Sequence, residues 1–266
     1  MNVKYVDAHC RIQFDQYQED QTELIERMKE EGVQGIVVGC NRESSERALA
    51  LAEKHEHLYA SAGLHPNREN DERYDISYQR ELAMNPLVVA IGECGLDYFR
   101  PTEVNDAVKE SQKELLKQQI ALAAELDKPL IIHSRPSKGT QDAYHDLIEI
   151  LTEAKQQHPN VRGDIHFFVG GITEAQALIA LGFTLSFTAV ITFTRDYDEV
   201  IRSVPLASIL SETDAPYVAP LARRGQRNDP LAVIDVVAQI AAIRGEDPET
   251  VRQTLAENSK RLFLLG

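Results

Sequence analysis

The sequence lacks the features of a membrane, secreted or disulfide-rich protein. No run approaches roughly 18 consecutive apolar residues, so we expect no membrane-spanning helix. The N-terminus MNVKYVDAHC has no long apolar stretch or cleavage pattern of a secretion signal. Only three cysteines are present (Cys10, Cys40 and Cys94), and none forms a CxxC pair. We therefore expect a cytoplasmic protein with reduced thiols.

Basic and aromatic residues are also scarce. The chain has 28 Lys and Arg against 42 Asp and Glu, a net charge of −14, and it contains no Trp. Proteins that bind long nucleic acids usually present a basic face to the phosphates, and single-strand binders stack bases on aromatic rings. The composition therefore argues against tight binding of long duplexes, but it is compatible with an enzyme that holds one strand end.

What the sequence does contain is a regular alternation of two patterns. Short apolar or β-branched runs predict strands at 3–9, 35–40, 58–63, 87–92, 129–133, 163–168, 183–187 and 207–212. Longer amphipathic stretches predict helices at 20–31, 43–56, 76–84, 104–127, 141–157, 173–181, 196–203, 231–244 and 247–258. Eight strands alternating with helices favour an α/β fold of the (β/α)8 TIM-barrel type, with an open doubly wound sheet as the alternative.

No composition shift, repeat or low-complexity segment divides the chain. With 266 residues and 43% hydrophobic content, it can build one large core. The stretch at 216–230 is rich in Pro and Arg, too short for a linker and too charged for a core, and we interpret it as a functional loop after the eighth strand. We expect one domain over 1–266, and we favour a monomer.

Five acidic or imidazole residues lie at the predicted strand ends: His9, Glu93, His133, His166 and Asp214. In a parallel barrel these ends converge on one mouth, where the active sites of this fold lie. A single histidine at a strand end is usually structural, but five such residues at one mouth predict a shared metal site. Side chains alternate along a strand, so Arg11 should share the face of His9, as Arg135 shares that of His133 and Glu212 that of Asp214.

These residues belong to ordered blocks that resemble the TatD-like metal-dependent deoxyribonucleases, which are amidohydrolase-type barrels. The blocks cover nearly the whole chain: DAHCR (7–11), GLHP (63–66), IGECGLDYF (91–99), IIHSR (131–135), HFF (166–168), ETDAPYVAP (212–220), RGQRNDP (224–230) and ENSKRLF (257–263). The resemblance implies a metal-dependent hydrolase of phosphodiester bonds in DNA. It also implies single strands or 3′ ends as the partners.

The resemblance also implies roles for the five residues. His9 and Asp214 correspond to ligands of one divalent cation, His133 and His166 to ligands of the other, and Glu93 to the bridging carboxylate. Such a pair polarises a phosphoryl oxygen and neutralises the leaving oxygen. Asp214 is then the candidate acceptor of the proton of the attacking water. The mixed ligand set suits Zn, Mn, Ni or Mg, with one or two ions per chain.

Substrate contacts are predicted for Arg135 and Arg224, because guanidinium matches phosphate geometry. His65 at the end of the third strand either binds phosphate or fixes its loop before Pro66. Arg227 and Asn228, on the loop that carries Arg224, are further candidates. The alternative for each arginine is an ion pair with a surface carboxylate.

One departure from the family pattern concerns the first strand. The family carries His-x-His there, whereas this chain has His9-Cys10-Arg11. A guanidinium stays protonated and offers no lone pair, so Arg11 cannot replace an imidazole ligand. We expect one weakened metal position, or an Arg11 that contacts the substrate phosphate in place of the lost metal. Arg223, where the family has a histidine, adds a second positive charge.

Three classes of function stay open. They are a metal-dependent deoxyribonuclease of reduced activity, a hydrolase of a small amide, ester or aminoacyl substrate, and a non-catalytic homologue. Barrel and ligands alone do not choose among them.

Overall fold

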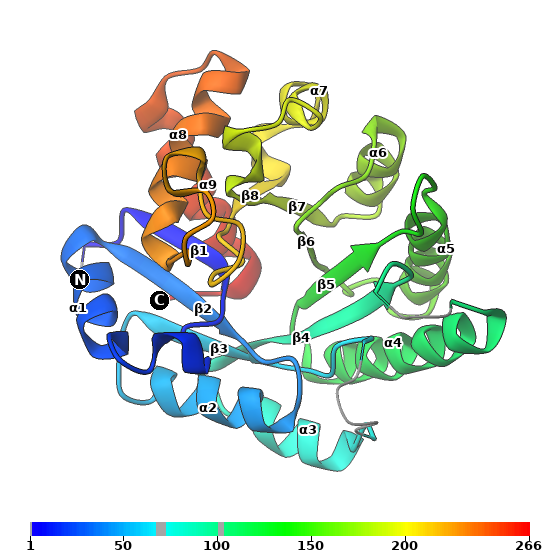
Figure 1. Ribbon diagram of the computed structural model, residues 1–266. Helices are drawn as coiled ribbons and strands as arrows, with labels where there is room; N and C mark the ends of the chain where they lie inside the picture. Colours follow the sequence, from blue (N-terminus) through cyan, green and yellow to red (C-terminus); the bar gives the residue numbers. More distant parts are fainter. Residues whose placement is uncertain (1, 68–72, 101–103) are drawn as a thin grey trace.

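The computed structural model describes residues 2–67, 73–100 and 104–266. Eight parallel strands form one sheet in the order β1-β2-β3-β4-β5-β6-β7-β8, and the sheet curls into a nearly closed barrel (Figure 1). The strands are β1 (Tyr5–Cys10), β2 (Val33–Val38), β3 (Leu58–Ala62), β4 (Val88–Asp97), β5 (Leu130–Arg135), β6 (Gly163–His166), β7 (Thr184–Phe187) and β8 (Ile209–Ser211). This architecture confirms the predicted TIM barrel and excludes the open doubly wound sheet.

The helices lie outside the strands and cover the barrel (Figure 1). They are α1 (Gln21–Glu31), α2 (Arg42–Ala52), α3 (Ile76–Ala83), α4 (Asp106–Leu126), α5 (Asp142–Gln157), α6 (Ile172–Ala180), α7 (Asp198–Ser203), α8 (Val233–Arg244) and α9 (Pro248–Phe263). Each predicted helix overlaps one of them. Local signals set several ends: Asn41 caps α2 in a capping box, and Gly32 ends α1 with a φ of 77°.

The barrel closes between its first and last strands through contacts near the mouth. The Asp214 amide donates to the His9 carbonyl, and the Arg11 amide donates to the Ala215 carbonyl, both at 2.9 Å. Below them the buried Asp7 carboxylate accepts from the Thr213 amide at 2.9 Å and from its hydroxyl at 2.6 Å. Residues more than 200 positions apart in the chain are therefore fixed side by side at the mouth.

Strand β4 differs from its prediction. The expected strand at 87–92 ends before Glu93, whereas the observed strand continues to Asp97, so Glu93 lies inside it. Pairing with β5 shifts register between Ile91 and Cys94, and Gly92 and Gly95 have φ of 147° and 136°. Only glycine adopts such angles without strain, and a Cβ at Gly95 would lie 1.9 Å from a backbone oxygen. The irregularity turns Glu93 into the barrel.

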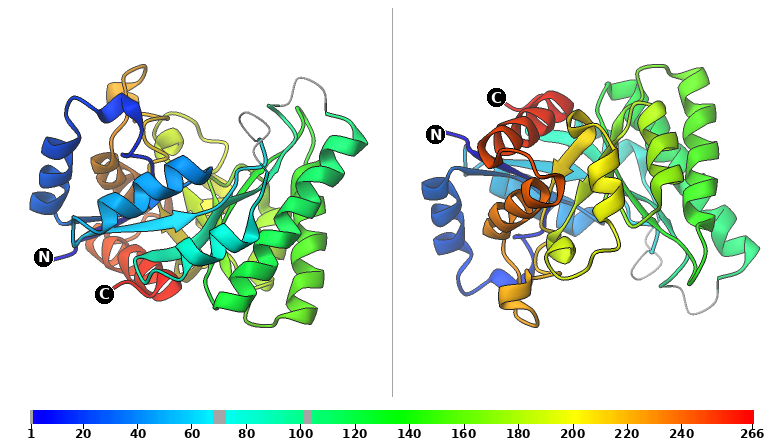
Figure 2. Two further views of the ribbon diagram at one scale, coloured as in Figure 1. Left: turned by 90° about the horizontal axis from the view of Figure 1, so that it is seen from below. Right: turned by 90° about the horizontal axis from the view of Figure 1, so that it is seen from above.

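Both chain ends lie at the end of the barrel opposite the strand-to-helix loops (Figure 2). The amide of Gly266 donates to the Tyr59 hydroxyl at 3.1 Å, which holds the C-terminus against β3. Among the described residues, no helix is both long and apolar enough to cross a membrane.

Candidate active site

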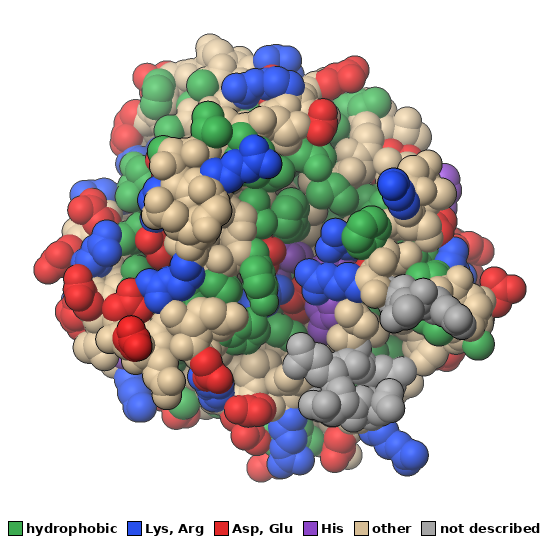
Figure 3. Space-filling model, in the orientation of Figure 1, with side chains coloured by type: hydrophobic (Ala, Val, Ile, Leu, Met, Phe, Trp, Pro, Cys, Tyr) green, Lys and Arg blue, Asp and Glu red, His purple; other side chains and the backbone are tan. Residues whose placement is uncertain are grey.

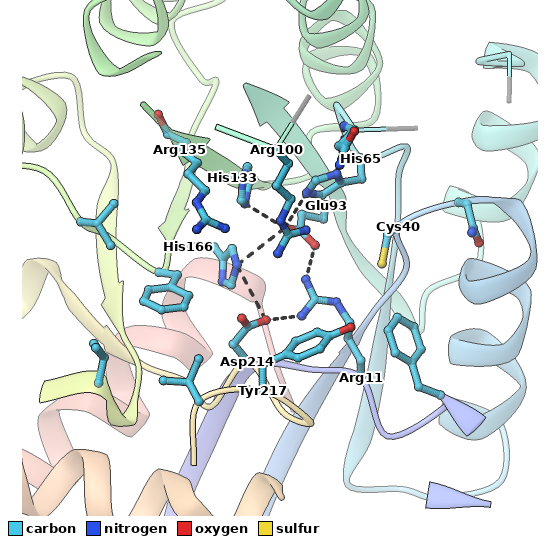
Figure 4. A pocket seen from close by; sticks show the side chains of 18 of the residues that line it. Arg11, Cys40, His65, Glu93, Arg100, His133, Arg135, His166, Asp214 and Tyr217 are labelled. Carbon is cyan, nitrogen blue, oxygen red and sulfur yellow. Dashed lines mark hydrogen bonds and ion pairs between the residues drawn. The ribbon is translucent and has the colours of Figure 1, made fainter. Parts of the chain in front are cut away.

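A cavity of about 570 Å³ opens at the carboxyl ends of the strands. Its mouth is visible in Figure 3 as a hollow where histidine and arginine side chains gather. The cavity is lined by residues from many strands and loops, among them Arg11, Cys40, His65, Glu93, Arg100, His133, Arg135, His166, Asp214 and Tyr217 (Figure 4). Four of the five predicted ligands thus line one cavity.

Glu93 is the centre of this site. Its Oε1 atom lies 3.3 Å from His133 Nδ1, 3.5 Å from His65 Nε2 and 3.6 Å from His166 Nε2. Its Oε2 atom accepts a hydrogen bond from Arg11. Oε1 therefore faces three imidazoles, whereas Oε2 faces the Arg11 guanidinium and, at 3.7 Å, His9 Nε2.

Arg11 lies between the carboxylates of Glu93 and Asp214. One terminal nitrogen donates to Glu93 and the other to Asp214 Oδ1, as Figure 4 shows. Only 6% of the residue is exposed. Burial acts against the charged guanidinium, but Glu93 and Asp214 outweigh it and raise the pKa of Arg11 further. The guanidinium is therefore a permanent cation at the place where both carboxylates converge.

His9 lies close to both Glu93 and Asp214. It is buried, and its ring stacks on that of His166 with 3.6 Å between centroids. His9 Nε2 lies 3.7 Å from Glu93 and 3.8 Å from Asp214 Oδ1, and neither ring nitrogen has a hydrogen-bond partner among the described residues. Burial, His166 and Arg11 together hold the pKa of His9 well below its usual range. His9 is therefore a neutral imidazole with unused lone-pair capacity.

His166 and His133, the other two imidazoles among the predicted ligands, differ from His9 because their pKa values are raised. Burial lowers the pKa of His166, but the Glu212 carboxylate outweighs it and raises that pKa to about 9. Burial likewise opposes the charged form of His133, and Asp97 and Glu93 outweigh it, so its pKa is raised. In His65 burial prevails and lowers the pKa to about 3.

One group of ligand atoms fits a divalent cation. Glu93, His133 and His166 each offer an atom, and these atoms lie within 4.8 Å of one another. Two imidazole nitrogens and a carboxylate oxygen are common ligands of Zn, Mn or Ni in hydrolases. These three residues could therefore hold one metal ion.

A second group is compromised by Arg11. His9, His166 and Asp214 also place ligand atoms within 4.8 Å of one another. However, Arg11 already binds the Asp214 oxygen that faces His9, and a guanidinium repels a cation. The single lone pair of His166 Nε2 also serves only one metal at a time. The donor set for a second ion is therefore incomplete.

Two predicted substrate residues lie in the cavity beside the first group. Arg135 follows His133 on β5, and its guanidinium lies 4.1 Å from the centre of the Phe99 ring. His65 Nδ1 accepts the Asn67 amide at 3.0 Å. A neutral imidazole then carries its proton on Nε2, so His65 presents a donor to the cavity and also fixes its own loop.

The arginines of the loop after β8 lie outside the cavity lining. Arg224 is exposed, with its guanidinium 4.6 Å from the Phe193 ring centre. Arg227 forms an ion pair with Asp20, and Arg223 pairs with Asp229 at 2.7 Å. Asn228 is buried and donates to the backbone of Thr213 and Val218, which is a structural role. The expected positive charge of Arg223 is thus neutralised by a neighbouring carboxylate.

Two carboxylates of the site were missing from the predicted set. Glu212 Oε2 lies 2.7 Å from His166 Nδ1. Asp97 Oδ2 lies 3.4 Å from His133 Nε2, and neither atom has a hydrogen-bond partner among the described residues. Strand alternation contained the signal for Glu212, which is two residues before Asp214. Asp97 lies beyond the strand predicted at 87–92, so alternation along that strand could not indicate it.

Comparison with known proteins agrees with this geometry. The profile of the family described as TatD related DNase matches residues 6–264. The protein of Bacillus subtilis named "Uncharacterized metal-dependent hydrolase YabD" is 38% identical over 264 residues, which cover 98% of this chain and 99% of that protein. The "3′-5′ ssDNA/RNA exonuclease TatD" of Pectobacterium parmentieri is 33% identical over 270 residues, covering 98% and 99%.

A solved structure extends the similarity to three dimensions. The crystal structure of the TatD homologue YjjV of Escherichia coli superposes with a TM-score of 0.89 at 32% identity, and it covers all of both chains. Family profile, relatives and fold therefore agree. The chain belongs to the TatD-related DNase family of metal-dependent hydrolases.

Proposed function

We propose that this chain hydrolyses phosphodiester bonds of DNA at single-stranded 3′ ends, with one metal ion held by Glu93, His133 and His166. Arg11 takes the place of the second metal. The observation that carries the proposal is the position of the Arg11 guanidinium, which joins Glu93 to Asp214 inside the cavity. A metal ion at the first group supplies Lewis-acid polarisation of a phosphoryl oxygen.

The charge of the cavity favours an anionic substrate. The chain as a whole carries −14, yet the cavity lining contains three arginines (Arg11, Arg100 and Arg135) against two carboxylates. Both carboxylates are already paired with Arg11. Guanidinium groups bind phosphate through paired N–H donors, so Arg135 is the best placed residue to hold a phosphate.

An aromatic ring at the cavity favours a nucleotide over a small amide. Tyr217 is 46% exposed although it lines the cavity, and its ring centre lies 5.8 Å from the Arg11 guanidinium carbon. An exposed ring beside an arginine provides a stacking platform for an unpaired base. The names of several relatives as single-strand exonucleases agree with this assignment.

In the proposed reaction, three residues of the cavity have separate roles. Arg135 holds the substrate phosphate, and the free donors of Arg11 contact a second phosphoryl oxygen. Asp214, which lines the cavity, accepts the proton of the attacking water. With a guanidinium instead of a second cation, we expect a slower reaction than a complete two-metal site provides.

The test is digestion of a 5′-labelled single-stranded oligonucleotide with Mn²⁺, Zn²⁺ or EDTA. We expect products shortened from the 3′ end with metal and none with EDTA. His133→Ala should abolish cleavage, whereas His145→Ala should not, because the His145 side chain is 68% exposed on α5 outside the site. Turnover of amide or ester substrates without DNA cleavage would instead select the amidohydrolase alternative. Metal binding with no turnover would leave a non-catalytic protein.

A further inference from the structure

Glu212 is a buried carboxylate that the proposed reaction does not use. It follows β8 and is fully shielded from solvent. Its Oε1 atom accepts the Phe167 amide at 2.6 Å, and its Oε2 atom lies 2.7 Å from His166 Nδ1. Both hydrogen bonds reach the point where β6 ends, so Glu212 joins the last strand to the segment that carries a candidate ligand.

These contacts determine what His166 can do. An ionised carboxylate only accepts hydrogen bonds, so the short contact requires the proton of His166 on Nδ1. The lone pair of a neutral His166 is then on Nε2, the atom that lies 3.6 Å from Glu93 Oε1. Glu212 thereby selects the ring nitrogen that faces the metal group.

Glu212 also restrains the surroundings of this ring. Phe167 has a φ of 47°, which non-glycine residues adopt at a cost, and the hydrogen bond from its amide to Glu212 holds the turn in that conformation. The same Oε2 atom lies 3.7 Å from His9 Nδ1, and the His9 ring stacks on His166. One carboxylate therefore faces the Nδ1 atoms of two stacked imidazoles.

We propose that Glu212 is a positioning residue that fixes the tautomer and ring orientation of His166 and so makes Nε2 a metal ligand. This rests on the proposed function, which places a metal ion at Glu93, His133 and His166. Carboxylates behind a ligating histidine raise metal affinity by about 10–100-fold in other metal sites. Glu212 would contribute an effect of that size without touching metal or substrate.

The sharpest test is Glu212→Gln. Because the Phe167 amide only donates, the oxygen of the new carboxamide must stay with it, and the NH2 group must face His166 Nδ1. The imidazole then carries its proton on Nε2, where no metal can bind. We expect the Kd for Zn²⁺, measured by titration calorimetry on the purified chain, to rise about 10–100-fold.

Asp164→Asn provides the matched control. Asp164 is another buried carboxylate inside the barrel, two residues before His166, but it accepts from the Ser186 and Thr184 hydroxyls rather than from an imidazole. Its substitution removes a buried acid at a similar depth. We expect the Zn²⁺ affinity of this variant to stay within about twofold of the wild type, because no ligand tautomer changes.

The outcomes separate the two claims. An unchanged Kd in Glu212→Gln overturns the role of Glu212 and leaves the proposed function standing. No Zn²⁺ binding by the wild type overturns both. If Glu212→Gln fails to fold, the ¹⁵N spectrum of the histidines in the Zn²⁺-loaded wild type decides. A proton on Nδ1 of His166 supports the role, and a proton on Nε2 overturns it.

Discussion

Arg11→His tests the central feature of the site, the guanidinium that joins Glu93 to Asp214. Removing one partner of a buried ion pair costs about 3–5 kcal/mol, because the remaining charges are left uncompensated. Here 6% of Arg11, 1% of Glu93 and 7% of Asp214 are exposed, so solvent screens the pair little. About 1 kcal/mol shifts the Tm of a domain of this size by about 2–4 °C. The metal-free variant should therefore melt about 10 °C below the wild type.

Metal should reverse much of this loss in Arg11→His. The new imidazole completes a group with His9 and Asp214, whose ligand atoms already converge. Binding at a concentration 100 times the Kd returns about 2.7 kcal/mol of stability. We expect one additional metal ion per chain by elemental analysis, a Tm that rises strongly with metal, and faster cleavage of single-stranded DNA.

Arg11→Met is the matched control, because its side chain has similar length but neither charge nor an imidazole nitrogen. It should show the same loss of stability without metal and a smaller recovery with it. The reasoning is refuted if Arg11→His binds no more metal than the wild type and melts at the same temperature with and without EDTA. An equal recovery of Tm with metal in Arg11→His and Arg11→Met would show that the new imidazole is not what binds the additional metal.

Three further predictions follow from the cavity and the barrel interior. Arg135→Ala should raise the KM for a single-stranded oligonucleotide by about 10- to 150-fold, since a phosphate contact to a charged group contributes about 1.5–3 kcal/mol; Arg224→Ala should leave it within about twofold, and equal effects would contradict the placement of Arg224 outside the cavity. Tyr217→Ala should slow cleavage of a single-stranded oligonucleotide but not of an abasic oligonucleotide of the same length, which has no base to stack; parallel losses would argue against stacking. Burial and the Glu212 charge raise the pKa of Asp164 from 3.8 to about 7. The stability that this neutral carboxyl provides is therefore full below pH 3.8 and is lost as the pH rises through 7. Asp164→Asn should flatten the decline in urea-unfolding free energy between pH 5 and 8, and an unchanged slope would assign it to another group.

Much of the fold was predictable because the spacing of apolar residues along the sequence differs between strands and helices. Eight apolar runs separated by amphipathic stretches leave few architectures, and the C-terminal ends of parallel strands must share one mouth. The convergence of His133 and His166 followed from that rule alone. By contrast, the depth of Glu93 within β4 depends on the register shift between Ile91 and Cys94 in the pairing with β5, and the apolar run at 87–92 gives no sign of that shift.

The arginines show more clearly which features of the site the sequence could not predict. Alternation placed Arg11 on the face of His9, but the direction of a long side chain depends on which carboxylates it meets. Its two partners are 82 and 203 residues away along the chain. The loop arginines were equally ambiguous, because Arg227 is held by Asp20 from the beginning of the chain. Such pairings are decided by tertiary structure and have no local signal.

The closure of the barrel between β1 and β8 has a consequence for the synthesis of the protein. The Asp214 amide is held by a hydrogen bond to the His9 carbonyl, and the Arg11 amide by a hydrogen bond to the Ala215 carbonyl. A nascent chain that has not yet released Ala215 from the ribosome has all three candidate ligands of the first metal group, but its barrel is open. The proposed hydrolysis of nucleic acid would therefore begin late in translation, after most of the coding sequence has been read.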